Sequence, residues 1–337
     1  MPEVTLETRD NSQVVFSCPE GQFVLGAAEA AGLYLPAICR DGVCGACHAH
    51  VSKGRYNHGP IAQSALTDAP SGGVLLCRCR PEGDLVIRVP YPKEDIRTQP
   101  LVPRESTIVE LTRVGAGYIT LKLALTPDPE LGIAAEFLPG QYMEVGIRDL
   151  PLRRAYSLAN LPNWDGQFEF LIRKKPGGVF TTWLDKYARV GDKLQVRGPL
   201  GRFVLDEISP RPRCFIAGGF GFGSVLSMLR HLAQFQDTQS TTLIFGADQQ
   251  HEQFGVGQIA EVKAALPMLR VIPTVWYPRA GPNGFARVLQ EFAALLQQSP
   301  EHPDVYVCGP QEFLEGVRAV AGTHQVPANQ IFTEQLL

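Results

Sequence analysis

The chain has 337 residues, of which 45% are apolar and 19% are charged, and its formal net charge is −3. This length predicts two or three domains, and the composition excludes a largely disordered chain. The near-neutral charge, with no long basic run, argues against nucleic acid or an anionic membrane surface as the main partner.

The first residues carry neither the basic nor the apolar stretch of a secretory signal. The longest uncharged apolar run, Cys214–Leu229, is shorter than the roughly 20 residues that a membrane span requires. We therefore expect a cytoplasmic protein that uses no membrane. In a reducing compartment its eight cysteines are not expected to form disulfides. Their clustering between residues 39 and 79 predicts a metal site there.

Residues 1–97 are expected to form the first domain. Its predicted elements are strands, with one helix stopped by a glycine. They lie at Val4–Thr8, Gln13–Ser17, Phe23–Ala31 (the helix), Ala49–Ser52 and Leu85–Val89. Several prolines follow, and they predict a fairly stiff linker over Tyr91–Glu105.

The cysteine-rich loop of this domain has the spacing C-x4-C-x2-C, and a fourth cysteine comes later. The four residues are Cys39, Cys44, Cys47 and Cys77. This is the spacing of a plant-type [2Fe–2S] site, and small residues between the cysteines leave room beside the sulfides. We choose Cys77 over Cys79 as the fourth ligand because Cys79 leads directly into the turn Arg80-Pro81-Glu82-Gly83.

Three other kinds of site share parts of this cysteine pattern. Cys44-Gly-Ala-Cys47-His48 is formally a haem c attachment motif, but haem c leaves Cys39 and Cys77 unexplained. A structural zinc site fits the glycines and the first gap poorly. A Rieske centre needs two histidine ligands, and the C-x-H pairing is missing.

Residues 98–205 predict a second domain, a small antiparallel barrel of short strands with one helix. The strands are expected at Thr107–Val114, Tyr118–Leu125, Tyr142–Ile147, Ala155–Ala159, Gln167–Arg173 and Lys193–Arg197, and the helix at Phe180–Tyr187. The sequence Phe137-Leu-Pro-Gly140-Gln-Tyr142 leads into one of the strands.

The motif Arg154-Ala155-Tyr156-Ser157 lies in this barrel. In a strand Arg154 and Tyr156 share a face, so an arginine can neutralise a pyrophosphate while an aromatic ring packs on a flat heterocycle. Downstream, a glycine-rich turn opens the helix and offers free N–H groups to a phosphate. Its residues are Gly177, Gly178, Val179 and Thr181. In this order, the two motifs predict a site for a flavin dinucleotide.

Residues 206–337 alternate between buried-looking strands and helices, which predicts a parallel doubly wound sheet. The strands are expected at Cys214–Ala217, Thr242–Gly246, Val271–Val275, Val305–Cys308 and Ile331–Thr333. The helices are expected at Val225–Gln236, Gln258–Leu266, Ala286–Gln297 and Glu312–Gly322.

The first of these strands ends in Gly218-Gly219-Phe-Gly221-Phe-Gly223-Ser224, where a dinucleotide-binding domain has its phosphate turn. Taken alone, the turn is equally compatible with simple strand-to-helix closure. Asp248 ends the next strand and favours NADH over NADPH, because its carboxylate would repel a 2′-phosphate. Cys308-Gly309-Pro310 ends a later strand, where the thiol either lies beside the nicotinamide or is a buried structural cysteine.

These motifs together resemble the reductase components of multicomponent bacterial oxygenases, over essentially the whole chain. That family includes the reductases of soluble methane, phenol and toluene monooxygenases and of benzoate and carbazole dioxygenases, systems that act in hydrocarbon catabolism. The resemblance implies a β-grasp [2Fe–2S] ferredoxin domain, an FAD barrel and an NAD domain. It also implies that Cys39, Cys44, Cys47 and Cys77 bind the cluster, Arg154, Tyr156, Ser157, Gly178 and Thr181 hold FAD, and Gly218, Gly219, Asp248, Cys308 and Gly309 serve NADH.

The chain departs from the family pattern at three places. In the nucleotide turn, usually G-G-T-G-x-A-P, Phe220, Gly223 and Ser224 replace Thr, Ala and Pro. The C-G-P-x-x-M motif has Phe313 in place of methionine. The family's terminal E-x-Phe is Glu334-Gln-Leu336, which lacks the aromatic ring.

The expected function is that of an NADH-dependent reductase, an enzyme that passes electrons from NADH to FAD, to the cluster, and on to an oxygenase component or its ferredoxin. NADH delivers two electrons at once and a cluster accepts one, which puts the flavin between them. This chemistry needs no general acid or base, so no catalytic side chain is nominated. The alternatives are a reductase that serves a deoxysugar dehydratase and a redox-sensing module with little turnover. A monomer is expected, with the partner docking on the rim Arg40–Val43.

Overall fold

The computed structural model describes the chain except for residues 39, 44, 67–71, 116, 148–151, 176, 249–253, 277–283 and 336–337. The described residues divide into two compact units, and the boundary along the chain lies between Leu101 and Val102. The first unit contains a five-stranded sheet and a separate two-stranded one, and the second contains a barrel and a parallel sheet. In the described part of the chain, no helix has both the length and the apolar character needed to cross a membrane.

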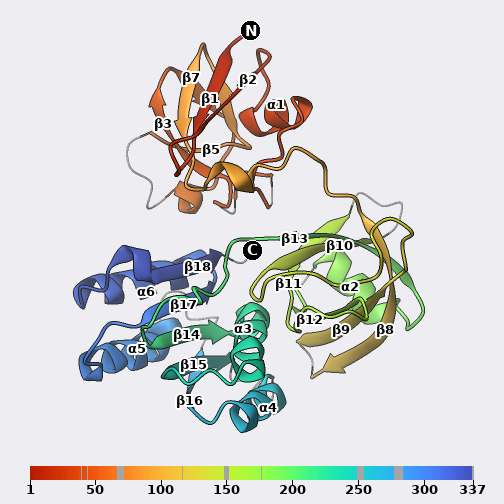
Figure 1. Ribbon diagram of the computed structural model, residues 1–337, viewed down its shortest axis with the longest axis vertical. Helices are drawn as coiled ribbons and strands as arrows, with labels where there is room; N and C mark the ends of the chain where they lie inside the picture. Colours follow the sequence, from red (N-terminus) through yellow and green to blue (C-terminus); the bar gives the residue numbers. More distant parts are fainter. Residues whose placement is uncertain are drawn as a thin grey trace. The chain divides into compact units, whose positions relative to one another are not determined.

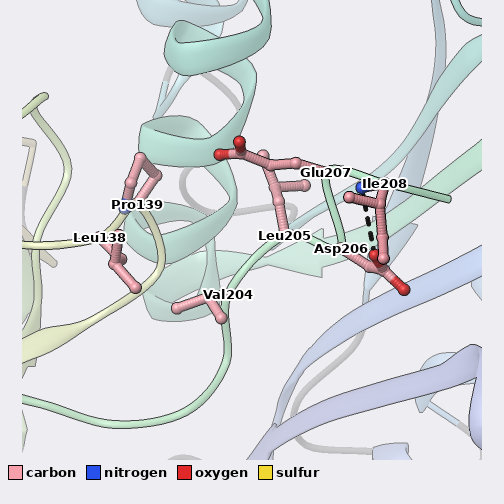
Figure 2. Close-up of a pocket in the computed structure, with 7 residues that line it drawn as sticks. All are labelled: Leu138, Pro139, Val204, Leu205, Asp206, Glu207 and Ile208. Atoms are coloured by element: carbon pink, nitrogen blue, oxygen red, sulfur yellow. Dashed lines mark hydrogen bonds between the residues drawn. The ribbon is translucent and has the colours of Figure 1, made fainter.

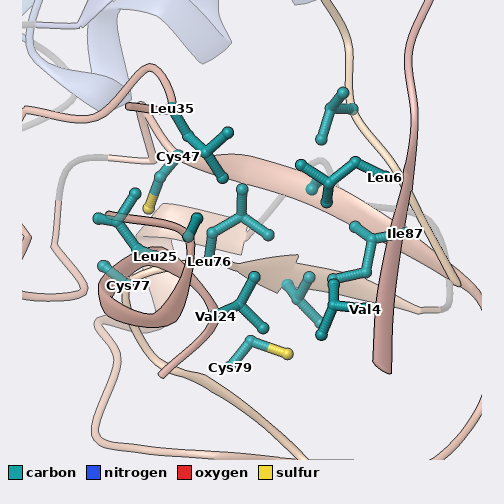
Figure 3. Close-up of a cluster of buried hydrophobic side chains, with 14 of the residues drawn as sticks. Val4, Leu6, Val24, Leu25, Leu35, Cys47, Leu76, Cys77, Cys79 and Ile87 are labelled. Atoms are coloured by element: carbon teal, nitrogen blue, oxygen red, sulfur yellow. The ribbon is translucent and has the colours of Figure 1, made fainter. Parts of the chain in front are cut away.

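The first unit is a mixed five-stranded sheet in the order β2-β1-β7-β3-β5, with one short helix packed on it (Figure 1). Its elements are β1 (Glu3–Glu7), β2 (Gln13–Ser17), α1 (Val24–Ala30), β3 (His48–Lys53), β5 (Gly73–Leu75) and β7 (Leu85–Arg88). The hairpin β1–β2 is antiparallel, whereas β1 and β7 are parallel. This is the predicted β-grasp arrangement. Its core is apolar and includes Val4, Leu6, Leu76 and Ile87 (Figure 3).

The predicted linker is shorter in the structure than in the sequence analysis. Tyr91 and Ile96 are buried in the core of the first unit, and Tyr34 exchanges backbone hydrogen bonds with Arg97. Strand β8 (Arg104–Val114) already begins at the other end. Apolar side chains in the proline-rich stretch therefore fix its first half to the first unit.

The barrel is a six-stranded antiparallel sheet in the order β11-β10-β13-β8-β9-β12, and an isolated bridge between Leu158 and Phe170 links its two end strands. Besides β8, its elements are β9 (Tyr118–Leu125), β10 (Tyr142–Ile147), β11 (Arg153–Ser157), β12 (Gln167–Arg173), α2 (Val179–Lys186) and β13 (Lys193–Leu200). Alternating Ile, Leu, Val and Phe side chains fill its interior. The predicted antiparallel barrel is confirmed.

The parallel sheet has the order β16-β15-β14-β17-β18, in which the chain starts in the middle and winds outward both ways. Its strands are β14 (Arg213–Gly218), β15 (Thr241–Asp248), β16 (Leu269–Trp276), β17 (Asp304–Gly309) and β18 (Ile331–Gln335). Helices α3 (Phe222–Gln234) and α4 (Val256–Ala265) belong to one apolar cluster, and α5 (Ala286–Gln298) and α6 (Gln311–Thr323) to another. The predicted doubly wound sheet is confirmed (Figure 1).

Helix α3 fastens the parallel sheet to the barrel through backbone carbonyl groups. The Ser227 hydroxyl donates to the Asn160 carbonyl oxygen at 2.6 Å. The Arg230 guanidinium donates to the Ala159 carbonyl oxygen at 2.9 Å and to the Glu169 carboxylate at 3.1 Å. These contacts hold the segment that follows the Arg154–Ser157 motif against the helix that follows the glycine turn.

Candidate functional site

The cysteine loop of the first unit follows a tight path that its sequence permits. Arg40, Gly42 and Gly45 all have positive φ, between 58° and 75°, a region in which glycine is unstrained. A Cβ atom on Gly42 would lie 2.7 Å from the Pro60 carbonyl oxygen. Two ion pairs brace this loop, from Arg40 to Glu29 and from Asp41 to Arg78. The second pair connects the loop to the residue that follows Cys77.

Two of the four predicted cluster ligands, Cys39 and Cys44, lie outside the described residues. The other two, Cys47 and Cys77, are both buried. The Leu76 N–H donates to the Cys47 carbonyl oxygen at 3.0 Å, which brings the chain just before Cys77 beside Cys47. Figure 3 shows the two cysteines on the same side of the apolar core.

Cys79 has a different environment from Cys77. It begins strand β6 (Cys79–Pro81), which pairs with β4 (Tyr56–His58), so the first half of the predicted turn is strand and the bend lies at Glu82 and Gly83. Burial, together with a smaller effect of Cys18, raises the pKa of the Cys79 thiol to about 12. A thiol that keeps its proton in the core is a poor metal ligand. This environment supports Cys77 as the fourth ligand.

The predicted flavin motif occupies strand β11, which pairs with β10. Arg154 is exposed, and no carboxylate of the described residues pairs with it. Burial raises the pKa of the half-buried Tyr156, and the positive charge of Arg154 partly opposes this rise. The two side chains therefore lie close together, as expected for residues on one face of a strand. Ala155 is exposed, whereas Ser157 is buried and pairs with Tyr142. The motif thus presents an exposed arginine and an aromatic side chain on one face of the strand.

The predicted phosphate turn lies next to this strand. Phe180, in the first turn of α2, packs against Tyr156 with ring centroids 5.8 Å apart. Gly178 precedes the helix and no side chain caps it, so the first N–H groups of α2 remain available to an anion. Gly177 has a φ of 72°, Val179 is exposed, and Thr181 is buried. The Thr181 hydroxyl closes the turn by donating to the Gly178 carbonyl oxygen at 3.2 Å.

The predicted nucleotide residues meet at the carboxyl ends of β14 and β17. Gly218 ends β14, and Gly219 begins a single 3₁₀ turn that leads into α3. A Cβ on Gly221 would lie 2.5 Å from the Cys308 carbonyl oxygen, so the turn packs closely against the backbone of Cys308. This is the edge where doubly wound sheets bind nucleotides. Asp248 ends the adjacent strand β15, and its side chain lies outside what the structure describes.

The sequence analysis gave no role to Glu334, which the structure places between the two predicted sites. Its Oε2 accepts hydrogen bonds from the Ser157 hydroxyl at 3.2 Å and from the Cys308 thiol at 3.4 Å. Burial raises the pKa of this carboxyl to about 7. In the sequence this residue is distinguished only by its place directly after the expected strand Ile331–Thr333.

A separate pocket of about 320 Å³ lies between Leu138–Pro139 and residues 204–208 (Figure 2). None of the predicted cofactor residues lines it. Two of the lining residues are hydrogen-bonded to each other, since the Ile208 N–H donates to the Asp206 carboxylate at 3.3 Å.

The fold and these residues define a modular iron–sulfur flavoprotein of the ferredoxin-reductase type. Three family models match in succession: a 2Fe-2S iron-sulfur cluster binding domain over residues 7–82, an oxidoreductase FAD-binding domain over 105–205, and an oxidoreductase NAD-binding domain over 215–319. The first match decides for iron–sulfur over haem, zinc and a Rieske centre.

Similar proteins identify the family more closely. The toluate 1,2-dioxygenase electron transfer component of Pseudomonas putida is 33% identical over 305 residues, which cover 88% of this chain and 87% of that protein. Methane monooxygenase component C of Methylosinus trichosporium is 33% identical over 80% of this chain and 79% of its own. The Amycolatopsis cytochrome P450 reductase GcoB superposes with a TM-score of 0.70 at 26% identity, covering 98% of both chains. The chain belongs to the family of iron–sulfur flavoprotein reductase components of oxygenase systems.

The protein is thus an oxidoreductase that uses FAD, a [2Fe–2S] cluster and NADH. The described residues fit these groups. Cys47 and Cys77 are buried thiols of the kind that bind iron. The exposed Arg154 and the N-terminus of α2 are suited to a flavin pyrophosphate, and glycines leave room for a nucleotide.

Proposed function

We propose that the protein is the NADH-dependent reductase of a multicomponent mono- or dioxygenase and supplies electrons to the oxygenase or hydroxylase component, directly or through its ferredoxin. One observation carries the proposal. Ser157 of the predicted flavin motif and Cys308 of the predicted nucleotide edge both donate to the same oxygen of Glu334. Two motifs from distant parts of the sequence therefore converge where a hydride would pass.

When bound, FAD accepts the hydride of NADH and releases its electrons one at a time to a one-electron cluster. The chain's own residues bind and position these groups. Arg154 and the N-terminus of α2 would hold the flavin pyrophosphate, and Tyr156 would pack against the flavin. The turn from Gly218 to Gly221 would receive the nucleotide phosphates, and the four cysteines would bind the cluster. Asp248 would select NADH.

We further propose three domains, at residues 1–97, 98–205 and 206–337. The three family matches and the three main sheets support this division. We also propose that the protein is cytoplasmic, because the cluster and the buried thiols suit a reducing compartment. We propose further that it is a monomer.

The docking surface that we propose for the acceptor protein is the rim Arg40–Val43 of the cysteine loop. It is close to the cluster ligands in sequence and carries the largely exposed Asp41 and Val43. Short-lived electron-transfer contacts need only a small area. The similar proteins serve different oxygenases by name, including a cytochrome P450, so the acceptor is a matter for experiment.

Anaerobic titration with NADH tests the proposal. An excess of NADH, which supplies more than the three electrons that FAD and the cluster together accept, should bleach both the flavin and the cluster absorbance. Steady-state cytochrome c reduction should follow. Bleaching without cytochrome c reduction would favour the redox-sensing alternative. Absence of bleaching with both cofactors bound would refute an NADH-dependent reductase.

A further inference from the structure

Arg78, which follows the proposed cluster ligand Cys77, packs against the middle of the cysteine loop. A Cβ on Gly42 would lie 2.9 Å from its Cγ and 3.3 Å from its Nε, so the glycine lets the arginine approach the loop backbone. The guanidinium forms an ion pair with Asp41 of the same loop. Its Cζ lies 5.4 Å from the centre of the Phe23 ring, within the range of a cation–π contact.

The backbone of Arg78 is fixed at the same place. Its N–H donates to the Leu75 carbonyl oxygen, and its carbonyl oxygen accepts from the Gly59 N–H, both at 2.8 Å. A Cβ on Gly59 would lie 3.0 Å from the Phe23 ring and 3.4 Å from the Arg78 Cδ. Close packing therefore determines both the chain path and the side chain, and the guanidinium keeps its place beside the loop.

One nitrogen of Arg78 is buried without an acceptor. Among the described residues, its Nε has no hydrogen-bond partner, although buried N–H groups in proteins normally have one. Sulfur atoms of iron–sulfur clusters and their cysteines accept hydrogen bonds from surrounding groups, and these bonds help to set the reduction potential. A buried N–H beside the cysteine loop is suited to this role.

The ion pair between Arg78 and Asp41 is asymmetric, with its positive end inside. The Arg78 side chain is 21% exposed, whereas that of Asp41 is 74% exposed. The other ion pair of the loop has the reverse order, because Arg40 is 43% exposed and Glu29 is 25% exposed. Water and salt screen an exposed charge more strongly than a buried one. Arg78 therefore contributes a net positive charge to the environment of the loop.

We propose that Arg78 raises the reduction potential of the [2Fe–2S] cluster and that Asp41 partly opposes this effect. The inference rests on the proposed function, because that function assigns the cluster to this loop. Reduction adds one electron, and with it one negative charge, while no bond forms or breaks. A positive charge and an N–H donor beside the loop both stabilise the reduced form. Arg78 thereby favours the passage of an electron from the flavin to the cluster.

The sign of the shift distinguishes an effect of charge from simple bracing of the loop. Arg78→Gln should lower the equilibrium constant for cluster reduction about tenfold, which is about 59 mV for one electron. Arg78→Lys keeps the charge but loses the Nε–H, so its potential should lie between those two. Asp41→Asn should raise the equilibrium constant about threefold or less, because the carboxylate is largely exposed. If Arg78 only braced the loop, removal of either partner would break the same ion pair and shift the potential the same way.

Redox titration of the holoenzyme with dithionite and mediators, followed by the EPR signal of the reduced cluster, tests the inference without NADH or turnover. Arg80→Gln is the matched control. The Arg80 guanidinium lies 4.2 Å from the centre of the same Phe23 ring, but its side chain is exposed, and within the described chain it forms no ion pair with the cysteine loop. This variant should change the equilibrium constant less than about twofold. Iron analysis of each variant confirms that the cluster is bound.

Three results would overturn the inference. They are an unchanged potential in Arg78→Gln, shifts of the same sign in Arg78→Gln and Asp41→Asn, and a shift in Arg80→Gln as large as that in Arg78→Gln. If Arg78→Gln binds no iron, Asp41→Asn decides, because a raised potential supports the inference and any other result refutes it. NADH should still bleach the flavin in every variant, so these failures would leave the proposed function intact. Absence of a cluster signal from the unchanged chain would refute both.

Discussion

The hydroxyl of Ser157 donates to the carboxyl of Glu334 at 3.2 Å, although the two residues are 177 positions apart. Ser157 ends a barrel strand, and Glu334 belongs to the last strand of the parallel sheet. The bond requires both halves of the second unit to be folded. The polar cluster around Glu334 is thus a product of the assembled unit.

Glu334 makes the stability of this unit depend on pH. Its folded pKa of about 7 exceeds the ordinary value of 4.5, so the folded state keeps a proton that the unfolded state releases. The contribution of Glu334 to stability is therefore greatest below about pH 4.5 and falls until about pH 7, by roughly 3 kcal/mol in total. Glu334→Gln should lack this decline. Urea unfolding at pH 5 and pH 8, followed by tryptophan fluorescence, measures the difference.

All three tryptophans lie in the second unit, so this signal reports on it. Glu136→Gln changes an exposed carboxyl of the same unit and should leave the pH dependence unchanged. Parallel curves for the unchanged chain and Glu334→Gln would show that the carboxyl does not titrate as described.

Two neighbouring glycines should respond oppositely to alanine. At Gly221 a Cβ would lie 2.5 Å from the Cys308 carbonyl oxygen, which must move to accept it. Gly221→Ala should weaken NAD⁺ binding at least tenfold, about 1.4 kcal/mol or more. At Gly223 the nearest atom is 3.4 Å away, so Gly223→Ala should fit and stabilise α3 by about 0.5–1 kcal/mol. Nucleotide titration and thermal unfolding of both variants check this, and equal effects would contradict the described turn.

Arg230 should contribute strongly to the stability of the second unit, because it joins the barrel to the parallel sheet. Its side chain is 16% exposed and that of Glu169 is 14% exposed. Arg230→Met would leave Glu169 without its partner and cost about 2 kcal/mol. Arg287 is the matched control, because it makes an exposed pair with Glu291 on α5, worth about 0.5 kcal/mol or less. Calorimetry should show a clear fall in Tm for the first variant only; similar falls would refute the assigned role of Arg230.

Substitution of Cys77 and substitution of Cys79 should have different effects on the iron content of the protein. Cys77→Ala removes a proposed ligand and should abolish the cluster absorbance. Cys79→Ala empties a core position and should cost about 1–2 kcal/mol of stability, with iron and acid-labile sulfide unchanged. Iron analysis and visible spectra of the purified variants decide the matter. Loss of iron from the Cys79 variant alone would reverse the ligand assignment.

Most of the secondary structure could be predicted because its signals are local. Runs such as Gln13–Ser17, Tyr118–Leu125 and Gln167–Arg173 became strands with the predicted bounds. The short strands β4, β5 and β6 were missed, since three residues with glycine or proline nearby carry no periodicity. Their partners are distant in sequence, and only the folded chain brings them together.

The candidate site likewise contains residues that could be predicted from the sequence and residues that could not. The motifs at Arg154–Ser157 and Gly218–Gly221 are contiguous, so each could be recognised from its own residues. Glu334 could not, because its partners Ser157 and Cys308 come from two other strands.

The docking of α3 on the barrel has a consequence for how such proteins can be recombined. The Ser227 hydroxyl donates to the main-chain oxygen of Asn160, and one N–H group of the Arg230 guanidinium donates to that of Ala159. Every amino acid carries such an oxygen. The barrel side of this contact can therefore change its residue types freely as long as its backbone path persists. A chimera that joins a foreign flavin barrel to this parallel sheet would keep the attachment if it retains the helix and the Glu169 equivalent.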